Sequence, residues 1–176
     1  MRRAALPMAT GLLAALLGFG WVYIRHHRFD ALIAEVSNGR GLDASLVSAV
    51  VWRESHYDPY QVGRAGEVGL MQVSREAGRE WAKAAAVNGF SSADLFDPRT
   101  NINVGAWYLA RALGRWAAQP DPLPFALAEY NAGPSNARRW AASGSPTNSH
   151  AFVEGITYPS TRRYVTAILR RYRGRY

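Results

Sequence analysis

The chain has 176 residues, a net charge of +8 and no cysteine. The length allows one domain with accessory segments, and the lack of cysteine excludes disulfides, thiolate catalysis and a lipid anchor on an N-terminal cysteine. Residues 1–28 hold four arginines and no acid, which leaves 17 basic and 13 acidic side chains, or +4, for the remainder. That modest charge, without zinc-finger spacing or an RNP-like stretch, argues against nucleic acid as a partner.

The first predicted element is the uncharged segment over residues 4–24. At about 1.5 Å per residue, a helix of this length spans the roughly 30 Å hydrocarbon core of a bilayer. Arginines flank the segment on both sides, and Trp21 and Tyr23 lie near its end, where aromatic rings favour the membrane interface. We therefore predict a single N-terminal transmembrane helix within residues 1–28. A signal peptide is the alternative, but no small-x-small cleavage site follows the apolar run.

The remainder, residues 29–176, is predicted to fold as one mainly helical (all-α or mainly α) globular domain, which is large enough for its own core. Periodic apolar residues and helix-stop signals predict helices over residues 29–37, 44–55, 70–86, 102–116, 125–130 and 161–172. Asp43 is the expected N-cap of the second helix. The glycine-rich residues 63–69 form a predicted loop without the GxxxxGK[ST] pattern of a phosphate-binding loop. No stretch of alternating apolar and polar residues is long enough to predict a β-strand instead of these helices.

Glu54 is the first candidate for chemistry. It follows Val47, Val50 and Val51 at helical spacing, so its side chain projects from the apolar face of the 44–55 helix. Desolvation there penalises the carboxylate and raises the pKa. A glutamic acid that is still protonated near neutral pH can protonate a departing glycosidic oxygen. The alternative is that the last helical turn lets Glu54 bend into water.

Five motifs, in order along the chain, resemble the catalytic domain of the soluble lytic transglycosylases, lysozyme-like enzymes that cleave peptidoglycan. The resemblance covers residues 42–173. The motifs are R-E-S at Arg53 to Ser55, G-L-M-Q at Gly69 to Gln72, N-I-N-x-G with Y-L at Asn101 to Leu109, A-x-Y-N-A-G-P at Ala128 to Pro134, and A-F-V-E-x-I with T-R-x-Y-V at Ala151 to Val165.

The resemblance implies a lysozyme-like fold with one catalytic acid/base, Glu54, and no metal or organic cofactor. It also implies a set of residues that bind the substrate, with the Tyr130 hydroxyl close to the Glu54 carboxyl. These residues are Ser55, Met71, Gln72, Tyr130 and Asn131. Taken without the family, Met71 and Tyr130 are equally compatible with ordinary core packing. The implied reaction cleaves glycan strands without water and leaves 1,6-anhydro-N-acetylmuramic acid ends, on the periplasmic side of the bacterial inner membrane.

Several alternatives stay open. A second carboxylate would make the protein a muramidase hydrolase, and Asp58 and Glu67 are the nearest candidates in sequence. The non-enzymatic alternative is a wall-binding or secretion-system scaffold with the same fold. Such a scaffold would have an unidentified partner in a cell-wall or secretion machinery. Ser160 stands where the family commonly has a glutamate before T-R-x-Y-V, which leaves that subsite open. The arginines of residues 162–175 are predicted to form a solvated helix face or to contact an anionic polymer or lipid.

Overall fold

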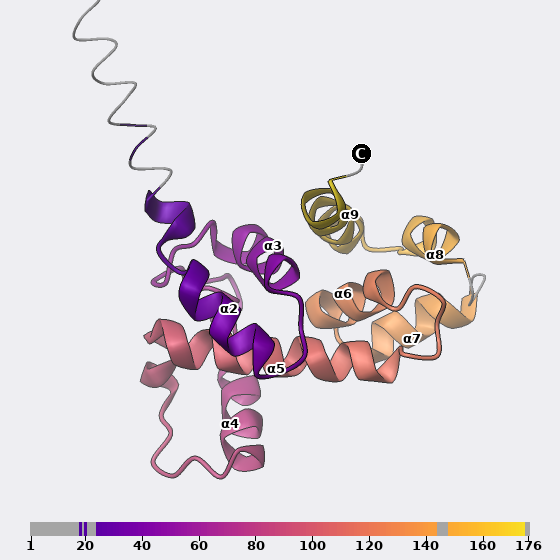
Figure 1. The fold of residues 1–176 in the computed structure, drawn as a ribbon. Coiled ribbons are helices and arrows are strands. Elements are labelled where there is room, and N and C mark those ends of the chain that lie inside the picture. The colour runs from indigo at the N-terminus through magenta and orange to yellow at the C-terminus, as the bar shows by residue number, and fades with distance from the viewer. Residues whose placement is uncertain (1–17, 19, 21–23, 144–147, 175–176) are drawn as a thin grey trace, which may run out of the picture.

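The computed structural model of the chain describes residues 18, 20, 24–143 and 148–174. The elements, in chain order, are α2 (Asp30–Asn38), α3 (Ala44–Ser55), α4 (Arg75–Ala84), the 3-10 helix η1 (Ser92–Phe96), α5 (Pro98–Arg115), α6 (Leu123–Ala132), α7 (Pro134–Ser143), α8 (Ser149–Gly155) and α9 (Pro159–Arg173). The described residues form a helical domain in which the long helix α5 runs across the middle, with α4 below it and α2, α3, α6 and α9 above it in the view of Figure 1.

The expected mainly helical fold is confirmed over the described residues. Their extended pairing amounts to two isolated bridges, from Val62 to Val68 and from Val68 to Val73. The predicted membrane segment, residues 4–24, lies almost entirely outside the described part of the chain. Within that part, no helix combines the length and the apolar character needed to cross a bilayer.

Local signals explain where the helices begin. Asp43 caps α3 by accepting a hydrogen bond from the Ser45 amide at 2.8 Å, as predicted. Asp97 caps α5 through the Thr100 amide, and Pro98 occupies the first position of that helix, where its missing N–H costs nothing. Because these caps satisfy amides that have no partner inside the helix, the two helices that frame the site have fixed first turns.

The predicted helix over residues 70–86 is wrong in its first five residues. The chain there forms a turn, and α4 begins only at Arg75, after the Ser74 cap. Gln72 has a φ of 47°, which no α-helix accommodates, and Val73 pairs with Val68 instead. The sequence reading also omitted η1, α7 and α8, which are short and lack a long apolar period.

The core lies around α6, whose first seven residues are all buried. This helix packs against α5 on one side and against α7, α8 and α9 on the others. Helix α3 packs against α2 and α9. The last turns of α3 and α6 therefore approach the first half of α9, and the candidate site lies among these three helices and the turn that precedes α4.

Candidate active site

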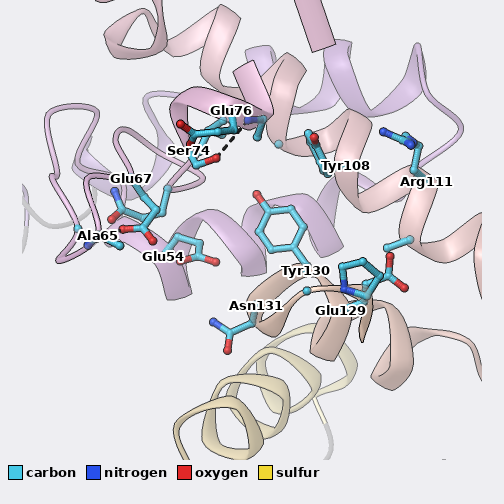
Figure 2. Close-up of a pocket in the computed structure, with 18 of the residues that line it drawn as sticks. Glu54, Ala65, Glu67, Ser74, Glu76, Tyr108, Arg111, Glu129, Tyr130 and Asn131 are labelled. Carbon is cyan, nitrogen blue, oxygen red and sulfur yellow. Dashed lines mark hydrogen bonds between the residues drawn. The ribbon is translucent and has the colours of Figure 1, made fainter. Parts of the chain in front are cut away.

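A pocket of about 1040 Å³ opens beside the last turn of α3. Its walls come from the loop of residues 63–67, the turn before α4 and the first turns of that helix, the middle of α5, and the junction of α6 with α7 (Figure 2). Acidic side chains line it along its whole length: Glu54, Glu67, Glu76, Glu80 and Glu129. A pocket of this volume is large enough for an organic ligand rather than a single ion.

The end of α3 fixes Glu54 at the pocket wall. The helix stops after Ser55 because His56 and Tyr57 both have positive φ, 50° and 62°. The Ser55 hydroxyl donates to the carbonyl oxygens of Val51, at 3.2 Å, and Leu70, at 2.9 Å. The last turn of the helix, which carries Glu54, is thus bonded to the turn that follows the glycine-rich loop.

The Glu54 carboxyl is half-buried, and burial is the largest influence on its proton affinity. Desolvation raises the pKa of Glu54 from 4.5 to about 7, although the hydrogen bond from Tyr164 and the charge of Arg53 lower it; the charge of Glu67 raises it further. With a pKa of 4.5, only about 0.3% of the carboxyl would carry a proton at pH 7, whereas with a pKa near 7 about half does. Glu54 therefore has the proton affinity of a general acid at neutral pH.

Tyr164, on α9, holds the Glu54 carboxyl in place. Its hydroxyl donates to Glu54 Oε1 at 2.6 Å. Burial raises the pKa of the Tyr164 phenol well above 10, so the hydroxyl stays protonated and remains a donor. Tyr164 was not predicted from the sequence as a site residue, although Tyr164 is the tyrosine of the T-R-x-Y-V motif. The signal was its position three residues after Thr161, on the same buried face of a helix.

Tyr130 lines the pocket between Glu54 and the α5 wall (Figure 2). Its hydroxyl donates to the carbonyl oxygen of Met71 at 2.9 Å. The pKa of Tyr130 is well above 10 because the phenol is buried and, secondarily, because Glu54 lies nearby. The bond joins α6 to the turn on the opposite wall.

Asn101 and Gly105, on α5, fix the turn that carries Gln72. The Asn101 side chain accepts from the Met71 amide and donates to the carbonyl oxygens of Val68 and Leu95, all at 2.7–2.8 Å. A Cβ on Gly105 would lie 2.5 Å from Met71 Sδ, so only glycine allows this approach. The N-I-N-x-G motif thus contributes through the backbone that it supports.

The structure places the predicted substrate-binding residues in two groups. Gln72 and Asn131 line the pocket together with Tyr130 and Glu54. Ser55 and Met71 are buried, and their side chains do not line it. They lie behind the wall and support the residues that do. Asn131 is held by the Thr161 hydroxyl, which donates to Asn131 Oδ1 at 2.8 Å. Ser160, at the start of α9, is exposed and lines the pocket where the resemblance leads one to expect a glutamate.

The end of the pocket away from Glu54 carries paired charges. Arg111 donates to Glu80 at 2.5 Å, and Tyr108 donates to the other oxygen of the same carboxylate. Glu129 is buried and accepts from Arg115 Nε at 2.6 Å and from Trp116 Nε1 at 2.8 Å. These acids are bound to cations, and Glu54 is not. Among the described residues, no three histidine, aspartate or glutamate side chains gather to hold a metal ion.

Known proteins share both the sequence and the fold. The transglycosylase SLT domain model matches residues 31–152. The soluble lytic murein transglycosylase of Escherichia coli strain K12 is 30% identical over 161 residues, which are 89% of this chain and 24% of that protein. The membrane-bound lytic murein transglycosylase C of Klebsiella pneumoniae is 32% identical over 158 residues, 84% of this chain and 44% of that protein.

Solved structures agree. The 70 kDa soluble lytic transglycosylase of Escherichia coli superposes with a TM-score of 0.74 at 32% identity, covering 83% of this chain and 24% of that one. An inactive glutamate-to-glutamine mutant of lytic transglycosylase Slt from Pseudomonas aeruginosa gives the same TM-score at 27% identity, covering 81% and 23%. The chain therefore spans about a quarter of these larger proteins. Since the family model covers most of the chain and the fold agrees, the chain belongs to the transglycosylase SLT domain family.

Proposed function

We propose that this protein is a lytic transglycosylase that cleaves the β-1,4 bond between N-acetylmuramic acid and N-acetylglucosamine in peptidoglycan. The observation that carries the proposal is the Glu54 carboxyl. It lies in the wall of a large pocket, it is held by a tyrosine hydroxyl, and its pKa near 7 leaves it protonated in part at neutral pH. The family relationship supports the choice of substrate, because relatives of this domain are named as lytic murein transglycosylases.

The reaction needs one carboxyl group that acts twice. Protonated Glu54 gives its proton to the glycosidic oxygen, the bond from that oxygen to the muramic C1 breaks, and the N-acetylglucosamine leaves as an alcohol. The N-acetyl oxygen of the substrate stabilises the positive charge on C1. The ionised Glu54 then takes the proton of the muramic C6 hydroxyl, and O6 bonds to C1. The product is a 1,6-anhydro ring, no water is consumed, and Glu54 regains its proton.

Tyr164 fits both steps. Its hydrogen bond stabilises the ionised carboxylate, which is the form that Glu54 adopts between them. Gln72, Tyr130 and Asn131 line the same pocket and are proposed to contact the sugar rings. Ser55 and Met71 are proposed to act from behind the wall, by holding the last turn of α3 and the Gln72 turn.

A hydrolase is the second candidate, because Glu67 lines the same pocket. Ordinary glycosidases use two carboxylates, and the second one activates water or attacks C1. The two candidates differ in the end group that they leave. Transglycosylation leaves 1,6-anhydro ends that are one water lighter than the reducing ends left by hydrolysis.

The decisive experiment treats wall sacculi with the protein and identifies the released fragments by mass spectrometry, with Glu54→Gln as the matched control. Anhydro ends that are absent with Glu54→Gln are the expected result. Reducing ends would favour the hydrolase. If the unmodified protein releases no fragments, both the transglycosylase and the hydrolase assignments are contradicted, and a wall-binding scaffold is favoured.

We further propose that residues 4–24 tether the domain to the inner membrane, facing the cell wall. The support is the uncharged length of this segment and its flanking arginines. Alkaline carbonate extraction of membranes tests the tether. The full chain is expected to stay in the membrane pellet, and a variant with Leu12→Arg and Leu16→Arg is expected to be released. Release of the unchanged chain would contradict the tether.

A further inference from the structure

Glu67 occupies a rigid position in the loop before the Gln72 turn. The Glu67 carbonyl oxygen accepts from the Gly63 amide at 2.7 Å, and Val68, the next residue, exchanges two backbone hydrogen bonds with Val73 at 3.0 Å. The Glu67 side chain folds back over this loop, and its Oε2 accepts from the Ala65 amide at 3.1 Å. Both the backbone and the carboxylate of Glu67 are therefore fixed by bonds within the described loop.

Gly63 shows how closely the neighbouring groups gather. A Cβ on Gly63 would lie 2.6 Å from Glu67 Oε2 and 2.7 Å from Gln72 Oε1. The two oxygens thus approach the same point, and Gln72 keeps its orientation because its Nε2 donates to the carbonyl oxygens of Gln61 and Gly69. The carboxylate is half-buried and lines the pocket on the side of Glu54 (Figure 2).

Glu67 is paired with no cation among the described residues, unlike Glu80 and Glu129. Charged and hydrogen-bonding groups from the elements around Glu54 affect the protonation of its carboxyl. Arg53, on the same helix, and Tyr164, on α9, favour the carboxylate, and the buried Tyr130 hydroxyl lies nearby on α6. Among the described residues that act on Glu54, Glu67 is the charge that favours the protonated form, and its effect is smaller than that of burial.

We propose that Glu67 is a second carboxylate of the active site, a positioning residue held by its loop on the Glu54 side of the pocket so that its negative charge adds to the effect of burial on the Glu54 carboxyl. This inference rests on the proposed function, because it assigns Glu67 a role in the first step of that reaction. Glu67 acts without forming a bond to the sugar, so the products remain anhydro ends.

The test follows the proton on Glu54 directly. The full chain, purified in detergent with ¹³C-labelled glutamate carboxyl groups, is titrated by NMR, and the Glu54 signal is assigned by its loss in Glu54→Gln. In Glu67→Gln the Glu54 midpoint is expected to fall by about half a pH unit or more, because a neighbouring negative charge is gone. The alkaline limb of kcat/KM on wall sacculi is expected to move to lower pH by the same amount, and Glu67→Asp is expected to keep the unmodified limb.

Glu76→Gln is the matched control. Glu76 lines the same pocket and the change removes the same charge, but Glu76 is exposed and is not among the groups that shift Glu54. Its Glu54 midpoint is expected to stay in place. A midpoint that moves in neither variant, or equally in both, would overturn the proposal. Reducing ends that disappear in Glu67→Gln would also overturn it, since Glu67 would then activate water.

The titration separates the two levels of inference. If the Glu54 midpoint moves in Glu67→Gln but the unmodified protein releases no fragments from sacculi, the proposed function is overturned and the charge coupling stands. Anhydro products with an unmoved midpoint in Glu67→Gln would support the function and remove the role of Glu67. Thermal unfolding of each variant establishes that it is folded before either measurement is compared.

Discussion

The raised pKa of Glu54 makes a quantitative prediction about stability. The carboxyl binds its proton more tightly in the folded protein, where its pKa is about 7, than in the unfolded chain, where it is close to 4.5. Folding is therefore most favourable, with respect to this group, below pH 4.5. Stability is lost as the pH rises from 4.5 through 7, because the folded state must then hold a poorly solvated charge. The difference corresponds to about 3 kcal/mol above pH 8.

Replacing Glu54 with glutamine removes that penalty and retains the shape of the side chain. The Gln oxygen can still accept from the Tyr164 hydroxyl. We expect Glu54→Gln to unfold at nearly the same temperature as the unmodified protein at pH 4.5. At pH 8.5 it should unfold at a temperature higher by about 6–12 °C, since 1 kcal/mol moves the Tm of a domain this size by roughly 2–4 °C. Cleavage of sacculi should be lost at every pH.

The assay is thermal unfolding, monitored by circular dichroism, at closely spaced pH values between 4.5 and 8.5. Glu129→Gln is the control of opposite sign, because the buried Glu129 is bonded to Arg115 and Trp116. Its loss should destabilise the fold at pH 7 by roughly 2–4 kcal/mol. A Tm difference between Glu54→Gln and the unmodified protein that does not grow with pH would refute the reasoning, since the Glu54 charge would then carry no penalty in the fold.

Three further substitutions test the supports of the site. Tyr164→Phe removes the hydrogen bond that favours the carboxylate, so the Glu54 pKa should rise and the alkaline limb of the kcat/KM profile should move to higher pH. Asn101→Ala leaves the Met71 amide and two buried carbonyl oxygens without their side-chain partner, and it should lower stability by about 2–4 kcal/mol in thermal unfolding. Gly105→Ala pushes a methyl group into the Met71 side chain, and it should cost about 1–3 kcal/mol together with most of the cleavage activity.

Each of these expectations has an outcome that contradicts it. An alkaline limb that moves to lower pH in Tyr164→Phe would mean that the hydroxyl favours the protonated acid. For Asn101, the neighbour Asn103 is the control. Its half-buried side chain makes one bond to its own helix and accepts a longer one, at 3.3 Å, from Arg40, so Asn103→Ala should cost less than about 1 kcal/mol. Equal losses at the two positions would remove the special role of Asn101. An active Gly105→Ala would show that the Met71 side chain moves aside freely.

The sequence predicted most of the helical framework and the central acid of the site, for physical reasons. Helices α3, α5, α6 and α9 carry long apolar stripes and clear caps or stops, and Glu54 follows one such stripe at helical spacing. The turn over residues 70–73 was not predicted because its geometry depends on Asn101. The Asn101 side chain accepts from the Met71 amide, thirty residues earlier in the chain. Local pattern alone favours a helix there, and a tertiary contact overrides it.

The partners within the site were less predictable. The resemblance implied a Tyr130 hydroxyl close to Glu54, and Glu54 does act on that phenol, but the hydrogen bond to the carboxyl comes from Tyr164, 110 residues from Glu54 along the chain. The side chains of Ser55 and Met71 point away from the pocket, which sequence spacing cannot reveal at a helix end and in a turn. Glu67 was a candidate second carboxylate on sequence proximity alone. Its half-buried position follows from backbone bonds in a loop whose conformation no periodicity specifies.

The bond from Tyr130 to the Met71 carbonyl has a mechanical consequence. It joins the two walls of the cleft at their base, and Asn101 fastens one of those walls to the longest helix of the domain. A cleft closed at its base cannot work as a hinged jaw without breaking buried bonds. If the chain is the lytic transglycosylase proposed above, a glycan strand meets a groove of set width, and its binding requires no closure of one wall onto the other.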